Sequence, residues 1–135
     1  MTESINAEEL ERENVAVVNR FCQFWEAKDM EGLLSLIDEH IFYQMWDADD
    51  ALKVQGKEEF EETVGGFLEG MDTVEFEVLR SQAMGKIVIN ERVDRFINED
   101  GKMIFPITGV FALESGKIVY WKDYIFPGKP MVSPF

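Results

Sequence analysis

A β-strand is predicted by the stretch IVINERVDRF, residues 87–96, which begins with β-branched residues and ends with an aromatic one. Side chains alternate along a strand, so one face carries Val88, Asn90, Arg92, Asp94 and Phe96. This face is apolar at both ends, which indicates that it points into the core. Its centre is polar, and buried charges are costly unless they are paired. An acid and an arginine on an inward face therefore indicate a functional pocket.

Length and composition favour a single globular domain. The chain has 135 residues, enough for one domain with a substantial core, so we expect one domain over residues 1–135. Its 27 acidic and 13 basic residues give a net charge of −14, which argues against nucleic acid and anionic membrane surfaces as partners. The single cysteine, Cys22, suits a reducing compartment, and the first residues lack the features of a signal peptide. The sequence therefore predicts a soluble, cytoplasmic protein.

Three helices are predicted in the first half of the chain. After a loose arm at residues 1–7, apolar residues recur at helical spacing until about residue 28. Asp29 then caps a short second helix, which the polar residues 38–40 break. A third helix is predicted over residues 57–68.

The remaining segments predict strands joined by turns. Residues 41–46 form a short aromatic strand, with Tyr43 and Met45 on one face, and the acidic residues 47–50 form a solvated loop. In the second half, alternation begins near residue 74. Hairpin signals then flank the strand at 102–113, in which Pro106 marks an edge or a bulge. The last strand is predicted at 117–126, and a proline-containing tail follows at 127–135.

A second acid occupies the same kind of position in the last strand. Asp123 shares a face with Val119, Trp121 and Ile125. The two hairpins place Asp123 two strands across from roughly Glu91 or Arg92, at a separation of roughly 10 Å. Thr108 or Gly109 lies between them, and a small residue there leaves room for the guanidinium. The sequence thus predicts an Asp–Arg–Asp row in which one carboxylate acts as a base and the other as an acid.

Four segments of the chain together resemble the limonene-1,2-epoxide hydrolase family. They are Glu91–Arg92–Val93–Asp94, Gly109–Val110–Phe111, Gly116–Lys117–Ile118 and Trp121–Lys122–Asp123–Tyr124. The resemblance covers about residues 8 to 126. It implies an α+β fold of the cone-shaped nuclear transport factor 2-like type, in which a curved antiparallel or mixed sheet wraps around three N-terminal helices.

The resemblance also implies roles for individual residues in a one-step mechanism without metal or cofactor. Asp123 takes a proton from water, Asp94 donates a proton to the epoxide oxygen, and Arg92 bridges the two. Tyr43 helps to hold the water. The family places an asparagine two residues after this tyrosine as a further water ligand, and this chain has Met45 there, whose thioether cannot donate a hydrogen bond.

A small apolar substrate is expected in a pocket between the helices and the sheet. The residues predicted to bind it are Trp25, Leu34, Met45, Phe67, Phe76, Val78, Phe96 and Trp121. The outward face of the first strand discussed is apolar at Ile87, Ile89 and Val93, which favours a homodimer through the sheet, as is common in the family.

Other interpretations remain open from the sequence. Arg92 and Asp94 also suit a structural ion pair on a wet sheet face. The same superfamily contains isomerases, cyclases and dehydratase-like enzymes, and its fold is reused by non-catalytic binding modules. Cys22 is expected to be inert core and His40 a capping or surface residue, and no Cys/His cluster has the spacing of metal ligands.

Overall fold

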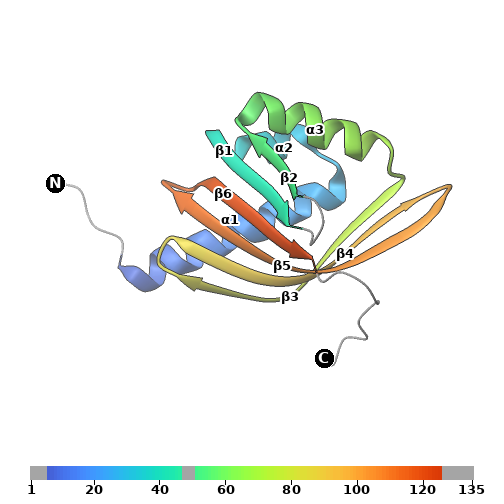
Figure 1. Cartoon of the computed structure of the whole chain (residues 1–135). Helices are drawn as coiled ribbons and strands as arrows, with labels where there is room; N and C mark the ends of the chain where they lie inside the picture. Colours follow the sequence, from blue (N-terminus) through green and yellow to red (C-terminus); the bar gives the residue numbers. More distant parts are fainter. Residues whose placement is uncertain (1–5, 47–50, 126–135) are drawn as a thin grey trace.

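The computed structural model describes residues 6–46 and 51–125, which form three helices and six strands (Figure 1). The helices are α1 (Ala7–Ala27), α2 (Met30–Ser35) and α3 (Lys57–Glu69). The strands are β1 (Ile37–Trp46), β2 (Ala51–Gln55), β3 (Thr73–Met84), β4 (Ile87–Asn98), β5 (Gly101–Glu114) and β6 (Lys117–Ile125). The predicted loop at 47–50, the predicted tail and residues 1–5 of the predicted arm lie outside the described residues.

The strands form one curved sheet in the order β2-β1-β6-β5-β4-β3. The β1–β6 pair is parallel and every other neighbouring pair is antiparallel. The sheet is not closed, and Figure 1 shows the β4–β5 hairpin extending beyond the helices. The predicted α+β fold, with a curved mixed sheet around the helices, is confirmed.

The ends of α1 and the start of α2 follow the expected capping chemistry. Asn6 caps α1, since its side chain accepts a hydrogen bond from the Glu9 backbone N–H at 2.8 Å. Lys28 adopts the left-handed conformation that ends α1, and Asp29 caps α2, as predicted, by accepting from the Gly32 N–H at 2.9 Å. The buried stripe of α1 packs on β3 and includes Phe21, Cys22 and Trp25.

The start of β1 corrects the sequence prediction. Residues 38–40 do not break a helix; they belong to the strand, which begins at Ile37. Pairing with β6 extends the chain here, because Ile37 lies opposite Ile118 and the Leu36 carbonyl accepts from the Ile118 N–H. A tertiary partner therefore overrides the polar composition of this segment.

Strand β2 was not predicted, and it pairs with β1 in an antiparallel arrangement. Only Val54 of this five-residue strand is described as buried, so its sequence carries too little alternation to be recognised.

The two predicted hairpins are present, and their registers refine the expected geometry. β4 and β5 pair without interruption from Asn98↔Gly101 to Ile87↔Ala112, so Pro106 does not introduce a bulge. Pro106 instead lies in the part of β5 beyond its described pairing with β6, which begins at Ile107.

Strand β6 contains a bulge that the sequence prediction lacked. Leu113 pairs with Ile118 and Ala112 pairs with Tyr120, so Val119 is the extra residue. Ile118 is therefore fully buried and Val119 only half-buried, which corrects the predicted face. After the bulge, Trp121 and Asp123 face inward as predicted.

The outer face of β4 is partly accessible, with Ile87, Ile89 and Val93 half-buried. The homodimer expected through this face remains a prediction. None of the helices in the described part of the chain has the length and hydropathy needed to cross a bilayer.

Candidate active site

The inward face of β4 carries polar side chains into the centre of the molecule. Asn90, Arg92 and Asp94 are each 1% exposed, between the buried apolar residues Val88 and Phe96. The strand alternation that predicted this face is confirmed. Three polar residues at alternate positions are buried because each of them finds a partner there.

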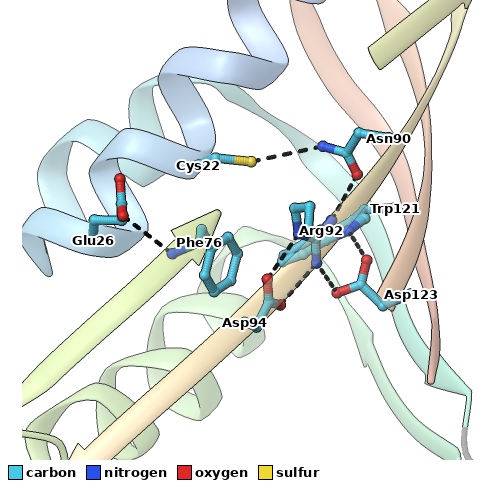
Figure 2. A network of polar contacts seen from close by, with 8 residues as sticks. All are labelled: Cys22, Glu26, Phe76, Asn90, Arg92, Asp94, Trp121 and Asp123. Carbon is cyan, nitrogen blue, oxygen red and sulfur yellow. Dashed lines mark hydrogen bonds and ion pairs between the residues drawn. The ribbon is translucent and has the colours of Figure 1, made fainter. Parts of the chain in front are cut away.

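Arg92 is the centre of a buried network of charge-assisted hydrogen bonds (Figure 2). Its Nε donates to Asp94 Oδ1 at 3.0 Å and its Nη2 donates to Asp94 Oδ2 at 3.0 Å. The same Nη2 donates to Asp123 Oδ2 at 2.8 Å. The geometry brings together the predicted Asp–Arg–Asp row, from β4 and β6.

A glycine on the intervening strand makes this convergence possible. Asp123 lies opposite Gly109, and Gly109 lies opposite Asn90, so the expected alignment with Glu91 or Arg92 was off by at least one residue. A Cβ atom at position 109 would collide with Arg92 Nη1 and lie 2.8 Å from Asn90 Oδ1 and 2.9 Å from Asp123 Oδ1. The missing side chain provides the space that the guanidinium occupies.

Trp121, on the same strand as Asp123, holds this carboxylate, and Tyr43 of β1 packs against the Trp121 ring. The Trp121 Nε1–H donates to Asp123 Oδ1 at 2.7 Å. The Trp121 ring stacks on Tyr43 with centroids 4.1 Å apart, because these two residues pair across the parallel β1–β6 ladder. Both oxygens of Asp123 therefore accept a hydrogen bond, and each retains a lone pair for a further donor.

Burial changes the proton affinity of the two acids. Burial raises the pKa of Asp94 to about 6, against the lowering effect of Arg92. Burial also raises the pKa of Asp123, while the charge and hydrogen bond of Arg92 and the hydrogen bond of Trp121 lower it. Two ionised carboxylates around one guanidinium leave an unbalanced negative charge in the core, so the pair favours retaining one proton.

The buried phenol of Tyr43 is held in its neutral form. Burial raises the pKa of Tyr43 well above its usual value, and the nearby Asp123 carboxylate adds to this effect. A protonated tyrosine keeps an O–H that can donate to a water or a ligand.

The two carboxylates line a small cavity of about 220 Å³. Its wall consists of Trp25, Tyr43, Met45, Leu52, Thr63, Val64, Phe67, Phe76, Asp94, Phe96 and Asp123. Five of the predicted substrate-binding residues lie in this wall: Trp25, Met45, Phe67, Phe76 and Phe96. The cavity is thus mostly apolar, with the acid pair at one point of its surface.

The other three residues predicted to bind the substrate lie outside this wall. Leu34 faces a separate groove shared with Glu39 and His40. Val78 packs against the core opposite Arg92, and Trp121 is fully buried between Tyr43 and Phe111. Trp121 contacts an acid of the site instead of the cavity.

Leu52, Thr63 and Val64 line the cavity and were not predicted to do so. Val64 and Thr63 precede Phe67 by one helical turn, so the spacing from Phe67 was the signal that could have located them. Leu52 belongs to β2, the strand that was missed, and no local signal marked it.

Cys22 is buried and His40 is at the surface, as predicted. Burial raises the pKa of the Cys22 thiol to about 12, so it stays protonated inside the core. His40 is exposed, although in a strand and not at a helix end.

The geometry provides the components of paired acid–base chemistry. Both carboxylates accept hydrogen bonds at both oxygens, and both line the cavity. Burial raises the pKa of Asp94 to about 6, which suits a group that donates a proton near neutral pH. Arg92 contacts both, so it can offset negative charge as the proton distribution between them changes.

The family model of the limonene-1,2-epoxide hydrolase catalytic domain matches residues 12–129. No curated protein shows significant similarity to the chain.

Solved structures share the fold at low sequence identity. An LEH-like epoxide hydrolase from M. tuberculosis has a TM-score of 0.70 and 22% identity, over 86% of this chain and 84% of that one. An NTF2-like protein from Burkholderia pseudomallei has a TM-score of 0.74 and 13% identity, over 84% and 91%. A phenazine biosynthesis-related protein from Pseudomonas aeruginosa has a TM-score of 0.77 and 15% identity, over 99% and 93%. At these identities the likeness shows the fold alone.

Proposed function

Because the chain belongs to the limonene-1,2-epoxide hydrolase catalytic domain family, we propose that it adds water to an apolar epoxide and releases a vicinal diol. The observation that carries this proposal is the Arg92 bridge between Asp94 and Asp123 at the wall of an apolar cavity. Hydration of an epoxide needs a base for the water and an acid for the epoxide oxygen at the same moment. Two buried carboxylates with one shared proton supply both.

The proposed reaction is a single displacement. Asp123 removes a proton from water as the water oxygen bonds to an epoxide carbon. The bond between that carbon and the epoxide oxygen breaks, and the oxygen receives the proton of Asp94. Asp94 ends ionised and Asp123 protonated, so a proton must return to Asp94 before the next turnover. Arg92 contacts both carboxylates and stabilises whichever one is charged.

Tyr43 is proposed to orient the attacking water. It lines the cavity beside Asp123, and its neutral phenol can donate or accept a hydrogen bond. Met45 lies opposite Asp123 in the β1–β6 ladder and offers only a weak acceptor. The water is therefore held by fewer polar groups than in the family pattern, which lowers the expected turnover without removing the acid–base pair.

The cavity limits the class of substrate. Its volume of about 220 Å³ is below the roughly 300–1,000 Å³ of drug-sized sites. Among the described residues of its wall, only Thr63 and the Trp25 indole add polar groups to those of Tyr43, Asp94 and Asp123. We therefore propose a small hydrocarbon epoxide without charged substituents.

Isomerisation is a second candidate, and Met45 favours it. An apolar residue opposite Asp123 makes the site drier, which suits transfer of a carbon-bound proton better than activation of water. In this reaction the ionised carboxylate of the pair removes a proton from one carbon of the substrate, and the protonated carboxyl group donates a proton to another atom of the substrate. The product then has the same composition as the substrate.

Labelled water separates these functions. Cyclohexene oxide, styrene oxide and limonene oxide are incubated with the protein in ¹⁸O-water, and the products are measured by mass spectrometry. Hydrolysis gives a diol with one ¹⁸O atom per molecule. An unlabelled product with the mass of the substrate supports isomerisation and overturns hydrolysis. Ligand-induced thermal shifts without any product favour a binding module.

A further inference from the structure

We propose that Asn90 is a positioning residue for the acid–base pair, because it fixes the Arg92 guanidinium in the orientation that bridges both carboxylates. This inference rests on the proposed function and adds to it a residue outside the Asp–Arg–Asp row. Asn90 does not line the cavity, so it acts through Arg92.

The contact that carries the proposal involves the third nitrogen of the guanidinium. Arg92 Nη1 donates to Asn90 Oδ1 at 2.9 Å, while Nε and Nη2 serve the two carboxylates. A planar guanidinium held at all three nitrogens cannot rotate without losing a hydrogen bond. Without the Asn90 oxygen, the guanidinium can turn toward Asp94 alone, and Nη2 then leaves Asp123.

Asn90 is itself held in a defined orientation (Figure 2). Its Nδ2 group lies 3.8 Å from Cys22 Sγ on α1, a weak contact that directs the Oδ1 atom toward Arg92. Gly109 leaves the space in which Asn90 Oδ1, Arg92 Nη1 and Asp123 Oδ1 approach each other. The helix, β4 and β5 therefore all restrict the amide to this position.

The neutral charge of Asn90 is part of its role. The ionisable groups that face the cluster are Cys22 from α1, Tyr43 from β1, Arg92 and Asp94 from β4, and Asp123 from β6. At this point β3 presents Phe76 and β5 presents Gly109, and neither ionises. An amide oxygen holds Arg92 as a carboxylate oxygen does, but adds no negative charge that would raise the proton affinity of the acid pair.

Two substitutions separate the acceptor from the charge. N90L keeps the approximate size of the side chain and removes the acceptor. N90D keeps the acceptor and adds a charge. N14L is the matched control, because Asn14 is also a buried asparagine, and its Nδ2 donates to the Gly85 carbonyl, away from the site.

The expected kinetic result is a different pattern for each variant. N90L lowers kcat for the epoxide about 10- to 100-fold with KM within about twofold, since the site is misaligned by a small movement. N90D retains most of the maximal kcat, but its pH–rate profile moves to higher pH by about one unit. N14L loses stability and keeps the parent kcat and pH profile.

A substrate-free measurement keeps this test independent of the proposed function. The side-chain carboxyl ¹³C resonances of Asp94 and Asp123 are titrated in the parent, N90L, N90D and N14L. We expect upward shifts of the pair's titration in N90L, from the loss of the bridge, and in N90D, from the added charge. If the parent makes no diol, the proposed function fails while the titrations still decide the role of Asn90.

The proposal is overturned if N90L keeps the parent titration and, where the parent is active, the parent kcat. A purely structural role predicts that N90L resembles N14L, with lower stability and unchanged titration. N90A also removes the acceptor without adding bulk, and it replaces N90L if that variant does not fold.

Discussion

Strand β4 carries two arginines, and each contacts two acids in very different surroundings. Arg92 holds Asp94 and Asp123 inside the core, where its side chain is 0% exposed and theirs are 2%. Arg95 holds Glu77 at 2.9 Å and Glu75 at 3.8 Å on the outer face, where its side chain is 26% exposed. The same combination of charges is a functional candidate in one place and a surface cluster in the other. Burial, and not the number of ion pairs, makes the difference.

Neutralising an acid in each cluster gives the largest expected contrast. D94N and D123N are each expected to lower kcat for epoxide hydrolysis about 10²- to 10⁴-fold, the usual contribution of a positioned acid or base. E77Q, the control on the outer face, is expected to keep kcat within about twofold. Diol formation is measured by gas chromatography, with circular dichroism to verify the fold. A D94N or D123N variant as active as the parent contradicts the proposed mechanism.

Removing the arginine from each cluster tests the energetic side of the comparison. R92M leaves two buried carboxylates without a cation, so we expect the free energy of unfolding at pH 7 to fall by about 3–5 kcal/mol. R95M is expected to lower it by about 0–1 kcal/mol, because water already solvates that cluster. Urea unfolding measures both values.

The loss in R92M should also depend on pH. Near pH 4 the two acids can take up protons, so the deficit relative to the parent is expected to shrink. Equal losses for R92M and R95M at pH 7 would mean that the inner cluster is effectively solvated.

The contrast between the clusters was visible in the sequence only through alternation. Residues 87–96 assigned Arg92 and Asp94 to the face with Val88 and Phe96, and Arg95 to the opposite face. That pattern needs no knowledge of the rest of the chain, and the structure confirms it. The turn residues near 100 and 115 likewise predicted the hairpins that bring β6 next to β5.

Features that depend on pairing between distant segments were less predictable. Residues 38–40 belong to the strand that pairs with β6, and the Val119 bulge lies in the pairing of β5 with β6, and local composition encodes neither feature. The row through Asp123 and Gly109 reaches Asn90, and not Glu91 or Arg92 as predicted, because hairpin signals define turns only approximately. The cavity wall from β2 was missed together with its strand. Local alternation thus predicted the chemistry, and long-range pairing decided its exact partners.

The inner cluster should also give the protein a characteristic dependence of stability on pH. Burial raises the pKa of Asp94 from 3.8 to about 6, so the folded state binds this proton more tightly than the unfolded state. The associated stabilisation is complete below pH 4 and is lost as the pH rises through 6. A shift of about two units corresponds to about 3 kcal/mol.

The difference between the parent and D94N isolates this contribution from the other acids. We expect the free energy of unfolding of the parent to fall relative to D94N by about 2–3 kcal/mol between pH 4 and pH 7, measured by urea unfolding. A difference that stays constant with pH would show that Asp94 ionises equally easily in the folded and unfolded states.

Replacing a glycine by alanine adds a single methyl group, and Gly109 at the buried cluster and Gly66 on α3 are expected to respond differently. In G109A the new Cβ meets Arg92 Nη1, Asn90 Oδ1 and Asp123 Oδ1, which their mutual hydrogen bonds hold in place. We expect a loss of about 1–3 kcal/mol in the free energy of unfolding, as for an overpacked core, and a fall in kcat with it. Gly66 of α3 has no heavy atom within 4 Å of the corresponding position, so G66A is expected to raise the free energy of unfolding by about 0.5–1 kcal/mol through helix propensity.

Urea unfolding of both variants beside the parent measures these two changes in the free energy of unfolding, which are expected to have opposite signs. If G109A is as stable and as active as the parent, the Arg92 cluster can move aside to accept a methyl group. The guanidinium would then not be held by its three partners, and the rigid bridge on which the site depends would be disproved. If G66A is more stable and G109A is less stable and slower than the parent, the loss in G109A comes from the contact of the new methyl group with Asn90, Arg92 and Asp123. It does not come from replacing a glycine as such.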